Sequence, residues 1–335
     1  MTETIATTPG LFPLPDWAKT RLGRLKGHQK HDLIDGSESA EVLETYEQAR
    51  GEVIDAQRDA GVDRIVEGQL RWDDMLAHPL TINPAVETGG IVRYYDNNNF
   101  YRHPTVTEVP EPTGDIAADL TRAAQLAPTQ SLQAVLPGPI TLADLSTDAC
   151  VNDTVEFHHV LAELLAGELA DAPHIETLYL LEPSLVTTPP EEDLCVELAE
   201  LYATVAAATD AEVVVHSYFG ALAEQTHVYL VDADVAGMGV DIVADDREQT
   251  IYNAGEYGMA DVMALGITDG QNTLVESAGT LVERVAWVFD QLPTADPTRL
   301  YPSTNTEPFY LPVSKHRQKL AAVAEAAAEV TEVGI

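Results

Sequence analysis

The chain has 335 residues, of which 18 are Lys or Arg and 55 are Asp or Glu, so its formal net charge is −37. This length suffices for one large domain or two ordinary ones, and 45% hydrophobic residues are typical of a globular protein. The negative charge excludes a broad nucleic-acid-binding face, and two cysteines exclude a disulfide scaffold or a Cys-rich zinc site.

The N-terminus shows no secretory signal, and no apolar run approaches the roughly 20 residues that a membrane span needs. We therefore expect a soluble, cytoplasmic protein without a membrane partner. Acidic residues spread along the whole chain favour a halophilic, salt-loaded cytoplasm, because the Debye length falls to about 3 Å at 1 M salt. The alternative is an acidic surface that binds a basic partner.

The cations are rare, and five of them lie close together near the N-terminus. These are Lys19, Arg21, Arg24, Lys26 and Lys30. Such a cluster is a candidate site for an anionic ligand such as a polycarboxylate or phosphate. The alternative is that the cluster neutralises neighbouring acidic residues on a solvated helix. We assign residues 1–35 to an irregular N-terminal extension with this cluster, and residues 36–335 to the main domain.

Along the main domain, short apolar segments alternate with amphipathic ones. A helix is predicted over 40–60, followed by strands at 64–67, 132–137, 176–183, 211–218, 237–243, 261–270 and 299–305. Helical patterns lie between them, for example at 157–171, 195–210 and 281–292. Seven or eight such βα units predict an α/β fold, a single (β/α)8 TIM barrel. The sequence lacks a glycine-rich dinucleotide fingerprint and a P-loop.

In such barrels the chemistry lies at the carboxyl ends of the strands. The residues at the predicted strand ends, which we call the strand-end ring, are Glu67, Gln69, Pro137, Gly138, Glu182, His216, Tyr218, Asp241, Asp269, Gln271, Asn272, Asn305 and Glu307. Glu182 is a candidate general acid or base, and its alternative role is to accept hydrogen bonds from a neighbouring loop. His216 is a candidate base or metal ligand, with a buried structural histidine as the alternative. Asp241 completes the catalytic candidates.

The segment 89–104 is rich in hydrogen-bonding and aromatic side chains. Arg93 and Arg102 flank Asp96 and three consecutive asparagines, of which Asn98 is the second. Long polar and aromatic loops on a barrel commonly recognise ligands. The alternative is a surface loop with asparagine-rich turns.

Several segments, in order, resemble cobalamin-independent methionine synthase, whose two barrels arose by duplication. They are RLKGHQK (24–30), VEGQLRWDDML (66–76), VRYYDNNNFYRHP (92–104), VLPGPITLADL (135–145), LLEPSLV (180–186), HSYFGAL (216–222), LGITDGQNTLVES (265–277) and STNTEPFYLP (303–312). They run through nearly the whole chain. The chain looks like the N-terminal barrel of that family, in a stand-alone, archaeal or halophile-like version.

In that family, His, Cys, Glu and Cys of the C-terminal barrel bind zinc, which activates the homocysteine thiol. In this chain the corresponding positions are Tyr218, Gly220, Asp241 and a position near Thr306. At least three of the four ligands are missing, so the resemblance implies no zinc on this chain. Leu181 also replaces the aspartate of the family's Asp-Glu-Pro motif.

The resemblance implies S-methylation of homocysteine from a methyl-folate, the 5-methyltetrahydropteroyltriglutamate–homocysteine methyltransferase reaction. The family's N-terminal barrel contacts the polyglutamyl folate through a basic segment and a later lysine, where this chain has Lys26 and Arg93. Asp96 and Asn98 are expected to help bind the donor, and Arg24, Asp269 and Asn272 are further candidate substrate-binding residues.

Because the family enzyme is about twice this long, we expect a separate zinc-bearing C-terminal-type barrel to act with this chain. Two alternatives stay open. The first is that the barrel is a catalytically silent, folate-binding accessory protein. The second is that it is a uroporphyrinogen-decarboxylase-like enzyme. The methyl donor, a folate, a related pterin or a methylated corrinoid protein, also stays open.

Overall fold

The computed structural model describes residues 2–24, 34, 37–95, 97, 99–233, 235–244 and 246–333. Three predicted binding residues, Lys26, Asp96 and Asn98, lie outside these described residues, as does the side chain of Arg24.

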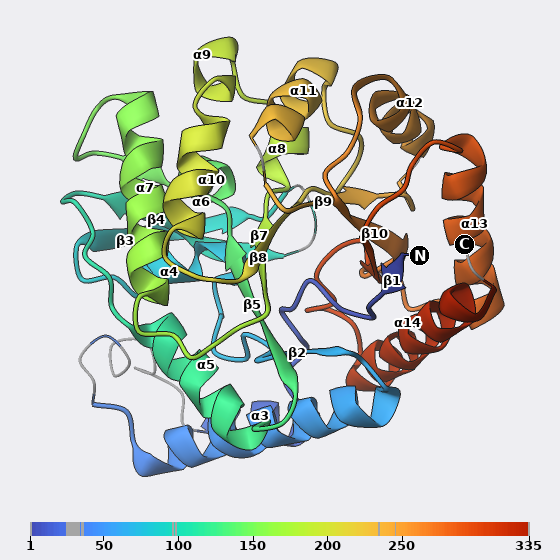
Figure 1. Cartoon of the computed structure of the whole chain (residues 1–335). Coiled ribbons are helices and arrows are strands. Elements are labelled where there is room, and N and C mark those ends of the chain that lie inside the picture. The colour runs from blue at the N-terminus through green and yellow to red at the C-terminus, as the bar shows by residue number, and fades with distance from the viewer. Residues whose placement is uncertain are drawn as a thin grey trace.

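Eight parallel strands form one sheet that curls into a barrel, with helices on its outside (Figure 1). The strands are β1 (Glu3–Thr4), β2 (Arg64–Val66), β5 (Ser131–Pro137), β7 (Thr177–Leu181), β8 (Glu212–His216), β9 (Gly237–Asp241), β10 (Val262–Thr268) and β11 (Arg299–Thr304). Neighbours in this order pair in parallel from β2 to β11, and β11 pairs with β1. The ring closes where the amides of Asp63 and Arg64 donate to the Ala6 carbonyl, at 3.0 and 3.3 Å. The predicted (β/α)8 barrel is confirmed.

The segment predicted as an N-terminal extension supplies the first strand of the barrel. Strand β1 has only two residues and pairs with Arg299 and Leu300 of β11. The following helix, α1 (Asp16–Arg24), packs against the outer helix α3 (Ala40–Ala60). Within the predicted extension, β1 therefore belongs to the barrel and α1 packs on its outer layer.

The outer helices follow the strands in turn. The longer ones are α3, α5 (Asp115–Leu126), α7 (Thr154–Leu169), α10 (Leu198–Ala206), α11 (Glu224–Asp232), α12 (Arg247–Tyr257), α13 (Ala278–Gln291) and α14 (Val313–Val333). Helix α3 has the predicted bounds because Ser39 caps its first turn and Gly61, with φ +81°, ends it. Short elements η1 (Met75–Ala77), α4 (His78–Thr81), α6 (Pro139–Asp144), β6 (Thr147–Asp148), α8 (Ser184–Thr187) and α9 (Glu192–Cys195) lie in the connections.

Strands β7 and β8 are buried on both faces of the sheet, as their near-continuous apolar runs predict. Inside the described ranges, no helix is both long enough and apolar enough to cross a membrane.

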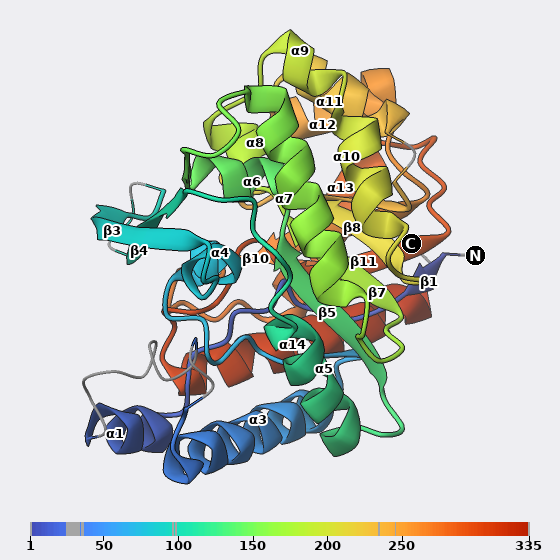
Figure 2. The same cartoon turned by 90° about the vertical axis from the view of Figure 1, so that its left-hand side faces the viewer.

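A hairpin stands out from the barrel where the sequence analysis expects a polar loop. Strands β3 (Val86–Arg93) and β4 (Phe100–Val106) pair antiparallel and project from the barrel (Figure 2). Arg102 anchors the hairpin, because its guanidinium donates to both carboxylate oxygens of Asp74, at 3.1 and 2.7 Å. The aromatic residues at the end of β3 are thereby held over the carboxyl ends of the strands.

Candidate functional site

At the carboxyl ends of the strands, Asn305 ties three neighbouring segments together. Its side-chain nitrogen donates to Asp241 at 2.9 Å, and its side-chain oxygen accepts from the amide of Gly270 at 2.8 Å. Its backbone carbonyl accepts from the His216 ring at 2.8 Å. One residue after β11 thus fixes the ends of β8, β9 and β10.

His216 is buried inside this arrangement. Its Nε2–H donates to the Asn305 carbonyl, and its Nδ1 faces Gly239, where a Cβ would come within 2.1 Å of that nitrogen. The rings of Tyr179 and Tyr218 pack beside it, with centroids 5.8 and 5.6 Å away. Burial lowers the pKa of His216 to about 4, against the opposing effect of the bond to Asn305. The imidazole is therefore neutral at neutral pH and held in place.

Asp241 uses both carboxylate oxygens within the protein. One oxygen accepts from the amides of Val243 and Ala244, and the other accepts from the Phe219 amide and the Asn305 side chain. Burial raises the pKa of Asp241, and these hydrogen bonds oppose the rise. The carboxylate organises two loops.

Glu182 follows β7, and its carboxylate reaches the start of α6 instead of Asn305. Its oxygens accept from the amides of Ile140 at 3.1 Å and Thr141 at 2.7 Å, and from the Tyr202 hydroxyl at 3.1 Å. A Cβ at Gly138 would lie 2.0 Å from the carboxylate, so glycine is required there. Burial raises the pKa of Glu182 to about 7.

The structure therefore brings His216 and Asp241 together through Asn305. Glu182 is their neighbour, since its amide donates to the His216 carbonyl at 2.8 Å, but its carboxylate turns to the start of α6. All three side chains have positioning roles within the protein. Their catalytic roles stay a prediction.

The positions that correspond to the family's zinc ligands do not form a zinc-binding set. Gly220 has no side chain, and Asp241 already accepts four hydrogen bonds. Tyr218 is a buried phenol whose pKa burial raises well above its usual value, so it stays neutral. Thr306 offers a hydroxyl instead of a thiolate. Zinc prefers thiolate, imidazole and carboxylate ligands, and these residues do not fit it.

Elsewhere among the described residues, His159, Glu197 and Glu200 place possible ligand atoms within 4.8 Å of one another. This group lies on the outer helices α7 and α10 and is partly solvent-exposed. His159 and Glu197 already pair at 3.2 Å. The group has the character of a surface ion pair.

The loop after β10 carries two predicted substrate-binding residues. Asp269 accepts from the amides of Gln271 and Asn272, and the exposed Asn272 accepts from the Leu274 amide. Both side chains shape a tight turn at the mouth of the barrel, and their role toward a substrate stays a prediction.

Sequence analysis did not single out the buried ion pair beneath this loop. The Lys319 amine donates to Glu276 at 2.7 Å, to the Thr268 hydroxyl at 3.2 Å and to the Leu274 carbonyl at 2.5 Å. Burial works to raise the pKa of Glu276, but the bonds from Lys319 and Thr268 outweigh it and lower that pKa to about 2. A lysine on the apolar face of α14, in line with Val323, is the sequence signal for this pair.

The predicted cation site is described only in part. Arg93 lies on the exposed strand β3, whereas Lys26 and the side chain of Arg24 lie outside the described residues. How these cations lie relative to one another stays a prediction.

A second cluster at the mouth combines a carboxyl group with aromatic residues. Glu307 follows β11, Tyr218 follows β8, and Tyr94 and Tyr95 come from the end of the hairpin. The strand-end ring contains Glu307 and Tyr218, but the strand pattern gave no sign that the hairpin would bring Tyr94 to them. The Tyr95 hydroxyl pairs with Ser184 at 2.7 Å and so links the hairpin to α8.

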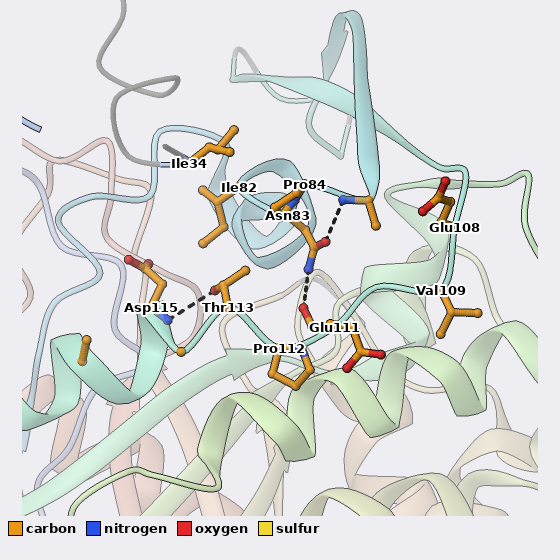
Figure 3. A pocket seen from close by; sticks show the side chains of 13 residues that line it. Ile34, Ile82, Asn83, Pro84, Glu108, Val109, Glu111, Pro112, Thr113 and Asp115 are labelled. Atoms are coloured by element: carbon orange, nitrogen blue, oxygen red, sulfur yellow. Dashed lines mark hydrogen bonds between the residues drawn. The ribbon is translucent and has the colours of Figure 1, made fainter. Parts of the chain in front are cut away.

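A groove of about 670 Å³ lies beside the start of α5 (Figure 3). Its sides are formed by Ile82, Pro84 and Val109 together with the carboxylates of Glu108, Glu111 and Asp115. The Asn83 side chain bridges the Ala85 amide and the Glu111 carbonyl beneath it. Three carboxylates make this groove unfavourable for a polyanion.

Comparisons with known proteins identify relatives of this fold. The family model for the cobalamin-independent synthase N-terminal domain matches residues 83–291. A B12-independent methionine synthase from Shewanella sp. W3-18-1, solved with selenomethionine, is 17% identical, with a TM-score of 0.79 and 98% of both chains covered. A putative vitamin-B12 independent methionine synthase from Listeria monocytogenes is 13% identical, with a TM-score of 0.69 and the same coverage. None of the curated proteins matches the chain.

Proposed function

The chain belongs to the cobalamin-independent synthase family, and from that premise we propose that it takes part in the S-methylation of homocysteine from a methyl-folate. In this proposal it is the half without zinc, and a separate C-terminal-type barrel supplies the zinc that activates the thiol. The two barrels together correspond to the two halves of the family enzyme.

This proposal depends mainly on which residues stand in the strand-end ring and on how they are hydrogen-bonded. A family barrel that activates a thiol needs thiolate and imidazole ligands, and Tyr218, Gly220 and Thr306 occupy those positions. His216, Asp241 and Glu182 are bonded within the protein rather than facing an open site. This arrangement favours a chain that binds the methyl donor and assists a partner over a chain that catalyses methyl transfer by itself.

The proposal also assigns the methyl donor to the cationic residues. In a chain of net charge −37, a folate with several glutamyl carboxylates needs local positive charge for binding. Lys26 and Arg93, with Arg24, supply that charge in this proposal. Asp96, Asn98, Asp269 and Asn272 would bind the polar parts of the ligand.

Calorimetry with methyltetrahydrofolate carrying three glutamates tests this assignment, with the single-glutamate form beside it. We expect the triglutamate to bind more tightly, and the Arg93→Ala variant to bind it roughly tenfold more weakly, the loss of a charge-assisted contact of about 1.4 kcal/mol. Arg247→Ala, on the outer helix α12, is the control and should bind as the parent does. If both folates bound equally well, or if the Arg93→Ala variant bound the triglutamate as the parent does, the assignment of the methyl donor to these cations would be contradicted.

A catalytically silent accessory barrel is the second candidate. The hydrogen bonds that occupy Glu182, His216 and Asp241 favour it, because none of the three is left with a free carboxylate oxygen or Nε2 for substrate. Donor binding without any effect on the partner's turnover would support this candidate.

A further inference from the structure

Strand β3 forms an open edge of the three-stranded sheet that projects from the barrel (Figure 2). The strand order of that sheet is β3–β4–β6, and within the described part of the chain β4 is the only strand that pairs with β3. Residues 87–91 of β3 are all exposed, and the strand contains no lysine or proline. Proteins commonly protect an exposed edge with those residues, because its backbone groups are a ready template for pairing with another chain.

The hydrogen bonds of the hairpin show which backbone groups of β3 face this edge. Ile91 lies opposite Arg102, whose amide donates away from β3, to Asp74 at 2.9 Å. Thr88 lies opposite Pro104, which has no N–H to donate. Both are therefore non-hydrogen-bonded pairs of the antiparallel ladder, in which the N–H and C=O groups point away from the paired strand. The backbone groups of Thr88 and Ile91 thus face the open edge.

The middle of β3 allows a second backbone to come close. The strand runs Val86–Arg93, so its midpoint lies between Gly89 and Gly90, where the register between β3 and β4 shifts. A Cβ placed on Gly90 would meet no atom within 4 Å outside its chain neighbours, and glycine inside a strand commonly marks the approach of another backbone. A two-fold axis at this midpoint would set Thr88 of one copy opposite Ile91 of the other, so that their N–H and C=O groups exchange hydrogen bonds.

The charges of the hairpin favour such an antiparallel arrangement. The outer half of the hairpin, residues 91–102, carries two arginines and one aspartate. The base of the hairpin, residues 83–90 and 103–111, carries three glutamates and no Lys or Arg. Parallel pairing of two copies would set these glutamates beside one another. Antiparallel pairing instead sets the base of each copy beside the outer half of the other, where the net charge has the opposite sign.

Exposed apolar side chains lie along the same hairpin. Ile91 is 73% exposed and Phe100 is 51% exposed. Phe100 pairs with Arg93, which is two residues from Ile91, so both apolar side chains project from one face of the hairpin. Val109, at the base, is 57% exposed and lines the groove beside α5. Antiparallel pairing brings the apolar outer half of one copy to the base of the other, where these side chains can be removed from water.

We propose that this chain forms a two-fold dimer through β3, whose open edge pairs antiparallel with β3 of a second copy. The two three-stranded sheets then form one sheet of six strands. Because each copy uses its β3 edge once, the assembly closes at two copies. Two chains of net charge −37 repel each other, and salt screens that repulsion, so the dimer is expected in concentrated KCl. This dimer does not depend on the proposed methyl transfer.

Sedimentation velocity of the full chain in concentrated KCl tests the dimer. We expect a mass twice that of one chain, which falls toward the mass of one chain on dilution. Thr88→Pro removes an edge-facing N–H without removing a bond to β4, and Ile91→Lys places a charge on the edge, so each should weaken association at least tenfold. Val196→Lys makes the same change in charge at another exposed apolar residue, and this control should associate as the parent does.

Hydrogen exchange of residues 86–93 at high and low protein concentration tests which surface is used. We expect slower exchange of this segment at high concentration, and this measurement needs no variant, so it decides the case if Thr88→Pro does not fold. A single-chain mass at every concentration, unchanged exchange over 86–93, or an unchanged dimer in the folded variants would overturn the proposal. Protection that appeared only with a zinc-bearing barrel would assign the edge to that partner and overturn it as well. All variants keep Arg93, so failure of the dimer and failure of the proposed donor binding are distinguishable.

Discussion

His216 shows how burial decides the behaviour of a single residue. The folded protein keeps the imidazole neutral, with a pKa of about 4, whereas an unfolded histidine titrates at its usual value of 6.5. Because the folded pKa is depressed, the unfolded chain binds a proton first as the pH falls. The resulting stability is present above about pH 6.5 and is lost as the pH falls toward 4.

We therefore predict that the parent loses about 2 kcal/mol through this residue between roughly pH 7 and pH 5. Gln at position 216 does not titrate and can still donate to the Asn305 carbonyl, so His216→Gln should lose that much less stability over the same range. Urea unfolding at the two pH values measures the difference. His174→Gln, at an exposed histidine, should keep the parental pH dependence. An equal loss in the parent and His216→Gln would show that His216 is charged or accessible in the folded protein.

At this scale the sequence predicts which residues stand at the strand ends, but not how they are used. Glu182, His216 and Asp241 were all expected at the barrel mouth, and all follow or end a strand. Their partners come from sequence-distant segments: Asn305 is 89 residues from His216, and Ile140 is 42 residues from Glu182. Only the closed barrel brings such pairs together, so no local pattern separates a catalytic carboxylate from a helix cap.

Helix α14 and the loop after β10 depend on each other through Lys319. Lys319→Met removes one partner of a buried pair, and among the described cations Glu276 then keeps Arg284 at 3.2 Å. Breaking a buried ion pair costs about 3–5 kcal/mol, so we expect a loss of that order and faster hydrogen exchange over 269–277. Exchange mass spectrometry with urea unfolding measures both.

Lys315→Met is the matched control for this change. Lys315 lies one turn earlier on the same helix and reaches Gln318 at the surface, so its replacement should leave exchange in the loop unchanged. Equal effects of the two variants would mean that the helix itself, rather than the buried pair, orders the loop.

The sequence pattern predicts most barrel strands but misses β1 and the β3–β4 hairpin, and each difference has a physical reason. Seven barrel strands were predicted because buried parallel strands are near-continuous apolar runs, as in β7 and β8. Strand β1 was missed because Glu3 and Thr4 form too short a segment to carry any periodicity. The hairpin was predicted as a loop because β3 is exposed and contains Gly89 and Gly90, which weaken a strand pattern.

For the whole molecule, the net charge of −37 makes electrostatic repulsion the main long-range interaction within the protein. Self-repulsion of this size opposes a compact barrel in dilute salt, and salt screens it. The expected salt-rich cytoplasm stays a prediction. Because salt screens the repulsion, assays on this protein should be carried out in concentrated KCl.

In the function that we propose, this barrel is one half of a two-barrel methyltransferase. Its residues at the family's zinc-ligand positions do not fit the metal, and Glu182, His216 and Asp241 are hydrogen-bonded within the protein.

The most direct test measures methionine formed from homocysteine and methyl-folate in concentrated KCl, by this chain alone and with a zinc-bearing C-terminal-type barrel, with the zinc content of each protein determined. We predict no zinc and no turnover for the chain alone, and a rate for the mixture well above that of the zinc-bearing barrel by itself. Stoichiometric zinc with turnover by this chain alone would contradict the account.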